Sequence, residues 1–161
     1  MALAACSSDG ASPAATAATS PGDGSTAVSG GSLAQAASQI TNPCTVMPID
    51  LVRQNIPDAA DPQQGPEPTL CSMTNGISVV QITFLGGFGE PDPGNEIVAD
   101  LGEKAWIEEQ FVGDAYLVIF LGVDDHGTYQ TMYVEYAGHD GVSNKDDAIA
   151  VARQIIATLQ G

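Results

Sequence analysis

Three runs rich in Val, Ile, Tyr and Phe follow one another late in the chain, and they constrain the fold more than any other feature. They cover residues 104–112, 115–121 and 128–136, with only short connections between them. Short connections favour antiparallel neighbours, because a parallel pair of strands needs a long crossover. Residues 76–85 alternate apolar and polar side chains and add a further strand. We therefore expect an antiparallel meander of about four strands.

The last segment, residues 144–160, has the spacing of an amphipathic helix. Ser143 or Asn144 can cap its start, where Asp146 and Asp147 meet the positive end of the helix dipole. Packed on one face of the sheet, this helix gives the α+β class, as a two-layer sandwich. Its apolar stripe is expected to consist of Ile149, Ala152, Ile156 and Leu159, with Ile155 beside it.

The first half of the folded region gives weaker signals. Residues 47–56 are expected to form a short helix, with Pro48 in its first turn and Pro57 after its end. Residues 58–68, rich in Pro and Gln, are expected to form a loop. Residues 86–97, rich in Gly and Pro, are expected to form another.

A low-complexity tract precedes this region. Residues 7–38 contain no aromatic residue, no Lys and no Arg, and consist mainly of Ser, Ala, Gly, Thr and Pro. Such a tract buries too little apolar surface to offset its chain entropy, so we expect residues 6–38 to be a disordered linker. Residues 39–161 then form a single α+β domain of ordinary length.

The residue at the head of this tract is Cys6, which follows Leu3-Ala4-Ala5. A small-residue cleavage site ending in cysteine is typical of a bacterial lipoprotein signal, and residues 1–5 are expected to be the remnant of that signal peptide. A thioether-linked lipid on Cys6, palmitate among its acyl chains, would attach the protein to the outer face of the cell membrane. Cys44 and Cys71 are then left as a pair, which an oxidising envelope lets form a disulfide.

The net charge of the chain limits the classes of molecule that it can bind. Asp and Glu number 20 against 4 Lys and Arg, which gives a formal net charge of −16. Such a chain repels nucleic-acid phosphates and anionic lipid headgroups, so we expect neither as a direct partner. A cationic partner or divalent ions remain open.

The titratable clusters favour structural roles. Asp124-Asp125-His126 resembles an acid–base pair, but an Asp-rich step before glycine is ordinary turn chemistry. The same interpretation applies to His139. The loop oxygens of Glu90, Asp92, Asn95 and Glu96 do not follow the order of a calcium loop. Common hydrolase motifs are absent from the sequence, so we predict no catalytic residues, no metal site, no cofactor and no enzymatic activity.

Aromatic residues concentrate on the predicted meander. Alternation places Tyr129 and Tyr133, with Tyr116, on one face. If the last helix covers only one face of the sheet, the other must be solvated, paired or filled by a ligand. We predict a ligand or partner face that comprises Trp106, Tyr116, Tyr129 and Tyr133.

The order of these features resembles the actinobacterial lipoproteins grouped as domain of unknown function 3558. The resemblance rests on the lipobox with its linker, on Asn42-Pro43-Cys44 before a short helix, on Cys71 before a strand, and on the final Ala-rich helix. Residues 98–106 are similar to a Leu-Gly-Asp-x-Ala step of such lipoproteins, with Glu103 at the place of the aspartate. The resemblance implies an envelope location, a disulfide and an α+β domain, and implies no activity.

Three functions follow as hypotheses. The first is a non-enzymatic, membrane-anchored binding or accessory module for an envelope protein or glycan. The second is a carrier or sensor of an apolar ligand held between sheet and helix. The third is an enzyme with scattered catalytic residues around His126 or His139. The long linker and the acidic domain without catalytic motifs favour the first.

Overall fold

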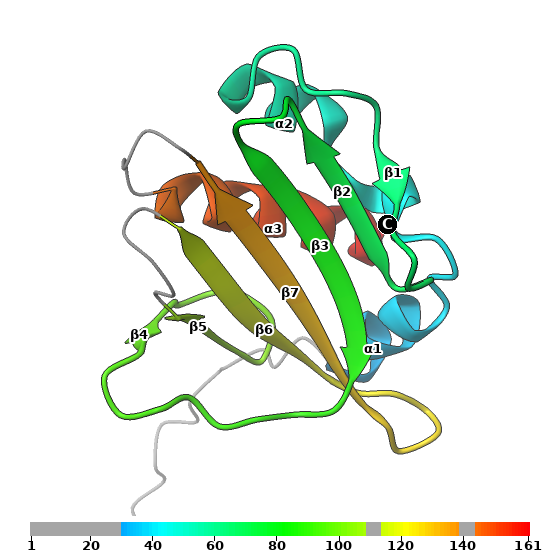
Figure 1. Cartoon of the computed structure of the whole chain (residues 1–161). Coiled ribbons are helices and arrows are strands. Elements are labelled where there is room, and N and C mark those ends of the chain that lie inside the picture. The colour runs from blue at the N-terminus through cyan, green and yellow to red at the C-terminus, as the bar shows by residue number, and fades with distance from the viewer. Residues whose placement is uncertain (1–29, 109–113, 139–143) are drawn as a thin grey trace, which may run out of the picture.

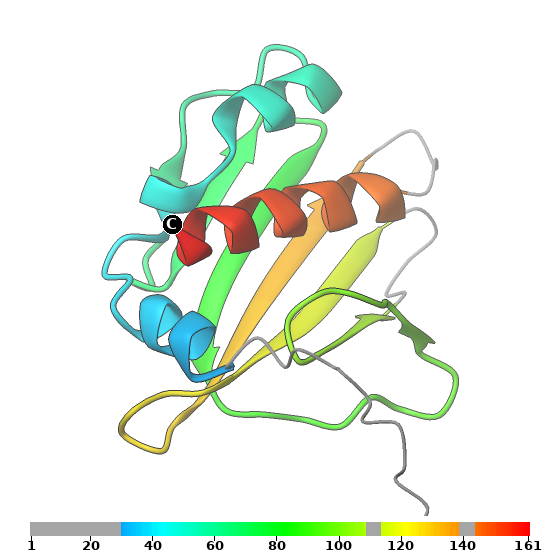
Figure 2. The same cartoon turned by 180° about the vertical axis from the view of Figure 1, so that it is seen from behind.

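An antiparallel sheet of seven strands forms the centre of the protein, and its helices lie on one face (Figures 1 and 2). This computed structural model describes residues 30–108, 114–138 and 144–161. The α+β class predicted from the sequence is confirmed, whereas the expected number of about four strands is too low. The predicted attachment residue Cys6 and the side chains of His139 and Ser143 lie outside the described residues.

The helices are α1 (Gly30–Ser38), α2 (Ile49–Asn55) and α3 (Lys145–Gln160), together with the 3-10 helix η1 (Pro43–Val46). The strands are β1 (Gln63–Gln64), β2 (Leu70–Thr74), β3 (Val79–Gly86), β4 (Glu96–Ile97), β5 (Lys104–Glu108), β6 (Ala115–Val123) and β7 (Tyr129–Ala137).

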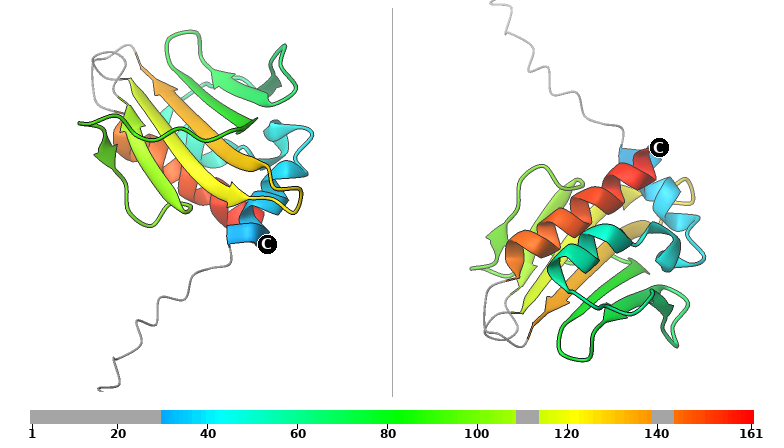
Figure 3. Two further views of the ribbon diagram at one scale, coloured as in Figure 1. Left: turned by 90° about the horizontal axis from the view of Figure 1, so that it is seen from below. Right: turned by 90° about the horizontal axis from the view of Figure 1, so that it is seen from above.

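Two antiparallel units make the sheet, in the order β1-β2-β3-β7-β6-β5-β4. Strands β5, β6 and β7 are the predicted meander, and β7 joins it to β3. The connection from β3 to β4 therefore passes the ends of β7 and β6 to reach the far edge (Figures 1 and 3). This connection carries residues 87–95 to one end of the sheet, where they take part in the site described below.

The strand expected at residues 76–85 begins later and has a partner that the sequence analysis overlooked. Gly76 has φ 88° and lies in a turn, in which Asn75 Oδ1 accepts the backbone N–H groups of Ile77 and Ser78. This turn connects β2 to β3 as a hairpin. Gly76 supplies the positive φ without steric cost, and the Asn75 side chain accepts the backbone N–H groups of the turn. The loop expected at residues 58–68 likewise contains the short strand β1, paired with β2.

The core fills the space between the sheet and the helices. Its helical side is set by Ala148, Val151, Ala152 and Ile155 of α3, all with 0 % exposure. The predicted stripe is therefore wrong by a partial rotation, since Ile149, Ile156 and Leu159 are only partly buried. Small residues at the centre of the buried stripe let α3 lie close to β6 and β7, which it contacts.

Helix α1 corrects the predicted linker, which was expected to reach residue 38. The helix occupies Gly30–Ser38 and buries Leu33, Ala34 and Ala37 against β6, β7 and α3. These three residues recur at a helical spacing, which forms an apolar stripe even in an Ala-rich sequence. The folded unit thus includes residues that composition assigns to the linker.

The predicted disulfide joins Cys44 of η1 to Cys71 of β2, whose Cα atoms are 5.1 Å apart. It fixes the η1–α2 segment to the sheet. The expected helix at residues 47–56 is present as the slightly shorter α2, which Pro48 precedes.

Candidate functional site

The face of the sheet turned away from the helices is here called the open face (Figures 1 and 3). Successive side chains of a strand point to opposite faces, so every second side chain lies on the open face. On β6 and β7 the residues between its members, such as Leu117, Ile119 and Val134, point into the core. The central part of the open face consists of Trp106 and Glu108 of β5, Tyr116, Val118 and Phe120 of β6, Thr131, Tyr133 and Glu135 of β7, and Gln81 and Thr83 of β3.

One end of the open face is covered by the β3–β4 connection. The ring of Phe88 lies 4.4 Å from that of Phe120, 6.3 Å from that of Trp106 and 6.1 Å from that of Tyr129, measured between centroids. Trp106 is only 2 % exposed as a result, and its indole N–H donates to Glu108 Oε1 at 2.9 Å. Trp106 thus belongs to a small apolar cluster, and in this structure it offers no contact surface.

Polar contacts hold the connection in place. Lys104 forms an ion pair with Glu90, and its Nζ lies 5.8 Å from the centroid of the Phe88 ring. The Thr131 hydroxyl donates to the backbone carbonyl of Gly87. The connection is therefore tied to β5 and β7 on either side of the Phe88 ring.

The rest of the open face carries what we call the tyrosine–glutamate patch: Tyr116, Tyr133, Glu108 and Glu135. The two tyrosine rings lie 5.6 Å apart with an interplanar angle of 35°. In the strand register Tyr116 stands between Glu108 of β5 and Glu135 of β7, so a carboxylate lies on each side of it. All four side chains are half-buried.

Two carboxylates, those of Glu108 and Glu135, set the electrostatics of the patch. Burial raises the pKa of Tyr116, and Tyr133, Glu108 and Glu135 raise it further. Burial also raises the pKa of Tyr133, with Glu108 as the second cause. The pKa of the Glu135 carboxyl is raised by burial and then by the charge of Asp114. Burial opposes a charge of either sign, whereas the neighbouring carboxylates oppose only further negative charge, so it is their contribution that favours a positive group at the patch.

The four predicted face residues therefore divide into two pairs. Tyr116 and Tyr133 form the accessible patch, whereas Trp106 and the half-exposed Tyr129 belong to the Phe88 cluster. Sequence reasoning missed Phe88, Glu108 and Glu135. Alternation along the strands places both glutamates on the tyrosine face, and that signal could have identified them.

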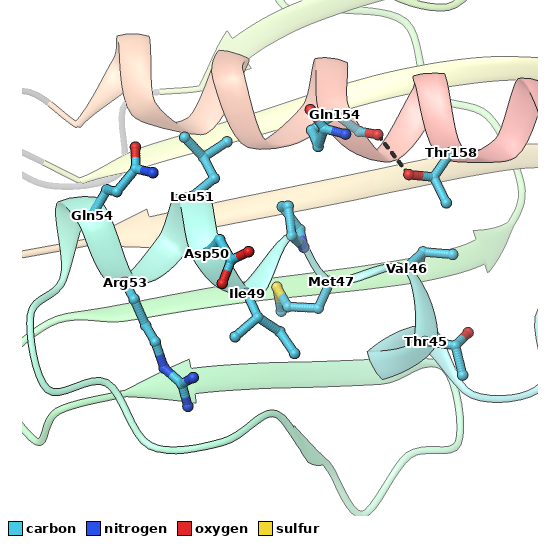
Figure 4. Close-up of a pocket in the computed structure, with 11 residues that line it drawn as sticks. Thr45, Val46, Met47, Ile49, Asp50, Leu51, Arg53, Gln54, Gln154 and Thr158 are labelled. Atoms are coloured by element: carbon cyan, nitrogen blue, oxygen red, sulfur yellow. Dashed lines mark hydrogen bonds between the residues drawn. The ribbon is translucent and has the colours of Figure 1, made fainter.

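A groove of about 820 Å³ lies on the opposite side of the molecule, between η1–α2 and the C-terminal half of α3 (Figure 4). It combines apolar side chains with polar ones, whereas the predicted carrier would need an apolar cavity between sheet and helix. The groove lies between helices, whereas the space between sheet and helices holds the core. It is lined by residues 45–51 together with Arg53, Gln54, Gln154 and Thr158.

The Asp124–His126 segment is a turn, as predicted. Asp124 Oδ1 accepts the backbone N–H groups of His126 and Thr128, each at 2.9 Å, and Oδ2 accepts from Gln130. These bonds lower the pKa of the Asp124 carboxyl, and the bond from Thr128 contributes most. The carboxylate thus organises the β6–β7 connection.

The carboxylates of Glu90 and Glu96, which the sequence places in one loop, pair with different lysines. Glu90 pairs with Lys104, and Glu96 pairs with Lys145 at the start of α3. Among residues 30–108, 114–138 and 144–161, no group of three or more His, Cys, Asp or Glu side chains is placed to hold a metal ion. Within the same ranges no helix has the length and apolar character needed to cross a membrane.

Comparison with protein-family models, with curated proteins and with solved structures found no match.

Proposed function

We propose that this protein is a lipid-anchored binding module of the bacterial cell envelope and that the tyrosine–glutamate patch is its contact surface. The lipid on Cys6 holds the chain at the outer face of the cell membrane. The residues before α1 supply a linker between the lipid and the folded unit. The protein acts by binding, without chemistry of its own.

The observation that carries this proposal is the position of the tyrosine pair. Tyr116 and Tyr133 lie on the face opposite the helices, beyond the part that Phe88 covers. Tyrosine supplies a large, rigid contact area with a polar tip. Such a side chain suits a surface that is exposed to water in the free protein and covered in the complex. The apolar core lies on the other side of the sheet and does not need these rings.

Crosslinking in intact cells tests the contact surface. A photo-crosslinking amino acid replaces Thr83, which is opposite Tyr133 in the register and keeps the patch intact. The control carries it at the exposed Gln160 of α3. We expect one specific adduct from position 83, absent from position 160 and lost when Tyr116→Ala is added. Equal adducts from both positions, or an adduct indifferent to Tyr116→Ala, would contradict the proposal.

A second variant tests the anchor. The Cys6→Ser protein, expressed behind a secretory signal that is removed without need of the cysteine, should move from the membrane fraction to the soluble fraction. Its retention in the membrane fraction would show that something other than a lipid on Cys6 holds the protein there.

A further inference from the structure

The open face already holds one cation, which belongs to the protein itself. Lys104 Nζ lies over the Phe88 ring at 5.8 Å and pairs with Glu90. An aromatic ring attracts an ammonium group through its quadrupole, and a carboxylate supplies the countercharge. At this end of the open face, an aromatic ring and a carboxylate thus hold an ammonium group between them.

The same combination recurs at the patch without its cation. Tyr116 and Tyr133 supply the rings, and Glu108 and Glu135 supply the carboxylates. The chain has only four Lys and Arg residues, and the structure describes all of them. Arg53, Lys104 and Lys145 pair with other acids, and Arg153 lies on α3 behind the sheet.

We propose that the patch binds the basic side chains of a partner polypeptide, presented by an extended segment rich in Lys or Arg. This inference rests on the proposed function and names the chemistry of the partner. The net charge of −16 attracts such a segment from a distance, and the patch then holds it.

The spacing of the two carboxylates favours a polypeptide over a single ion. Glu108 and Glu135 lie on strands separated by β6, so their backbones are roughly 10 Å apart, twice the spacing between neighbouring strands. A metal ion needs several oxygen ligands around one point, and in the part of the chain that the structure describes no group of three or more His, Cys, Asp or Glu side chains is placed to hold one. In an extended segment, alternate residues on one side are about 7 Å apart. Flexible Lys or Arg side chains can span the remaining distance to two carboxylates whose backbones are roughly 10 Å apart.

Titration with a defined peptide tests this inference. The probe is acetyl-Lys-Gly-Lys-Gly-Lys-amide, and the matched control peptide has norleucine at each lysine. The full chain, carrying Cys6→Ser to stay in solution and labelled with ¹⁵N, is followed by NMR. We expect the lysine peptide to shift the amide signals of Tyr116, Tyr133 and Glu135, with an affinity that falls as salt is added. The norleucine peptide should leave these signals in place.

Two charge variants separate local recognition from general attraction. Glu135→Gln removes a charge of the patch, and Glu103→Gln removes one from an exposed position outside it. We expect the first to weaken binding about fivefold and the second by less than about twofold. Equal losses would overturn the inference, because net charge alone would then explain binding. Equal binding of the two peptides would overturn it as well.

A neutral oligosaccharide, chitotriose, distinguishes failure of this inference from failure of the proposed function. If chitotriose shifts the patch signals and the lysine peptide does not, the basic partner is wrong and the binding module stands. If no probe shifts the patch signals but position 83 still gives an adduct that Tyr116→Ala abolishes, the basic partner is again wrong and the binding module stands. If no probe shifts them and position 83 gives no such adduct, both proposals are wrong.

Discussion

The backbone N–H of Asp125 donates to the side-chain Oε1 of Gln35 at 3.1 Å, across 90 residues of sequence. The bond connects α1 to the β6–β7 turn that Asp124 organises. Together with the contacts that α1 makes with β6 and α3, it makes this helix an integral part of the fold.

We therefore expect Leu33→Ala to lower the free energy of unfolding by about 2 kcal/mol, as for other leucines truncated in a core. Leu33 is 5 % exposed and belongs to the main core cluster. Denaturant titration of the full chain measures the change. The exposed Gln39, just after α1, provides the control, and Gln39→Ala should change stability by less than about 0.5 kcal/mol. Equal stability of the Leu33→Ala variant and the parent would mean that α1 does not contribute.

The disulfide is expected to stabilise the fold by restricting the unfolded chain. It joins residues 27 apart, and closure of such a loop is worth about 3.5 kcal/mol in the chain-entropy treatment. Cys44→Ala should lower the free energy of unfolding by that amount, measured with denaturant. This variant is the cleaner one because it retains the fully buried Cys71 side chain. Reduction of the parent protein provides the control, since it should lower stability to a similar extent. A Cys44→Ala protein as stable as the oxidised parent would contradict this account.

The sequence predicts the elements that have a regular apolar spacing, and it does not predict those that are too short to have one. The meander and α3 are long enough for alternation and helical spacing to be visible. Strands β1 and β4 have two residues each, and only tertiary pairing makes them strands. The pairing of β3 with β7 joins segments far apart in sequence, so local patterns cannot reveal it.

The candidate site shows the same division. The shared face of Tyr116 and Tyr133 follows from strand alternation. The burial of Trp106 does not, because Phe88 reaches it from a Gly-rich connection without any pattern of its own. Composition is equally silent about α1, whose alanines pack well only because β6 and α3 lie beside them.

Gly102 is expected to tolerate no side chain. Its φ is 63°, and a Cβ there would lie 2.5 Å from the carbonyl oxygen of Phe120 and 2.8 Å from Ile119 Cγ2. Gly102→Ala should lower the free energy of unfolding by more than about 2 kcal/mol, since backbone strain and a steric clash add. Gly127 has a similar φ of 77° with open space around it, so Gly127→Ala isolates the backbone strain. Thermal unfolding compares the two variants, and similar losses would show that the contact with β6 is unimportant.

Glu135 is expected to decrease stability at neutral pH, because its raised pKa means that the folded state disfavours its charge. Below the unfolded-state pKa of about 4.3 the carboxyl is neutral in both states and carries no penalty. The penalty grows as pH rises from there through the folded-state pKa and is then constant. Glu135→Gln should therefore stabilise the protein at pH 7, by no more than about 0.5 kcal/mol after solvent screening, and leave it unchanged at pH 3.

This gain is the reverse of the effect expected on binding, where the same substitution weakens the affinity for a basic peptide. A residue that costs stability and supports binding has the behaviour expected of a functional surface. Denaturant titrations of the parent and of Glu135→Gln at pH 3 and pH 7 measure the difference, with Glu103→Gln as the exposed control of equal charge. A Glu135→Gln protein less stable than the parent at pH 7 would show that the carboxylate serves the fold, and the case for the patch as a binding surface would weaken accordingly.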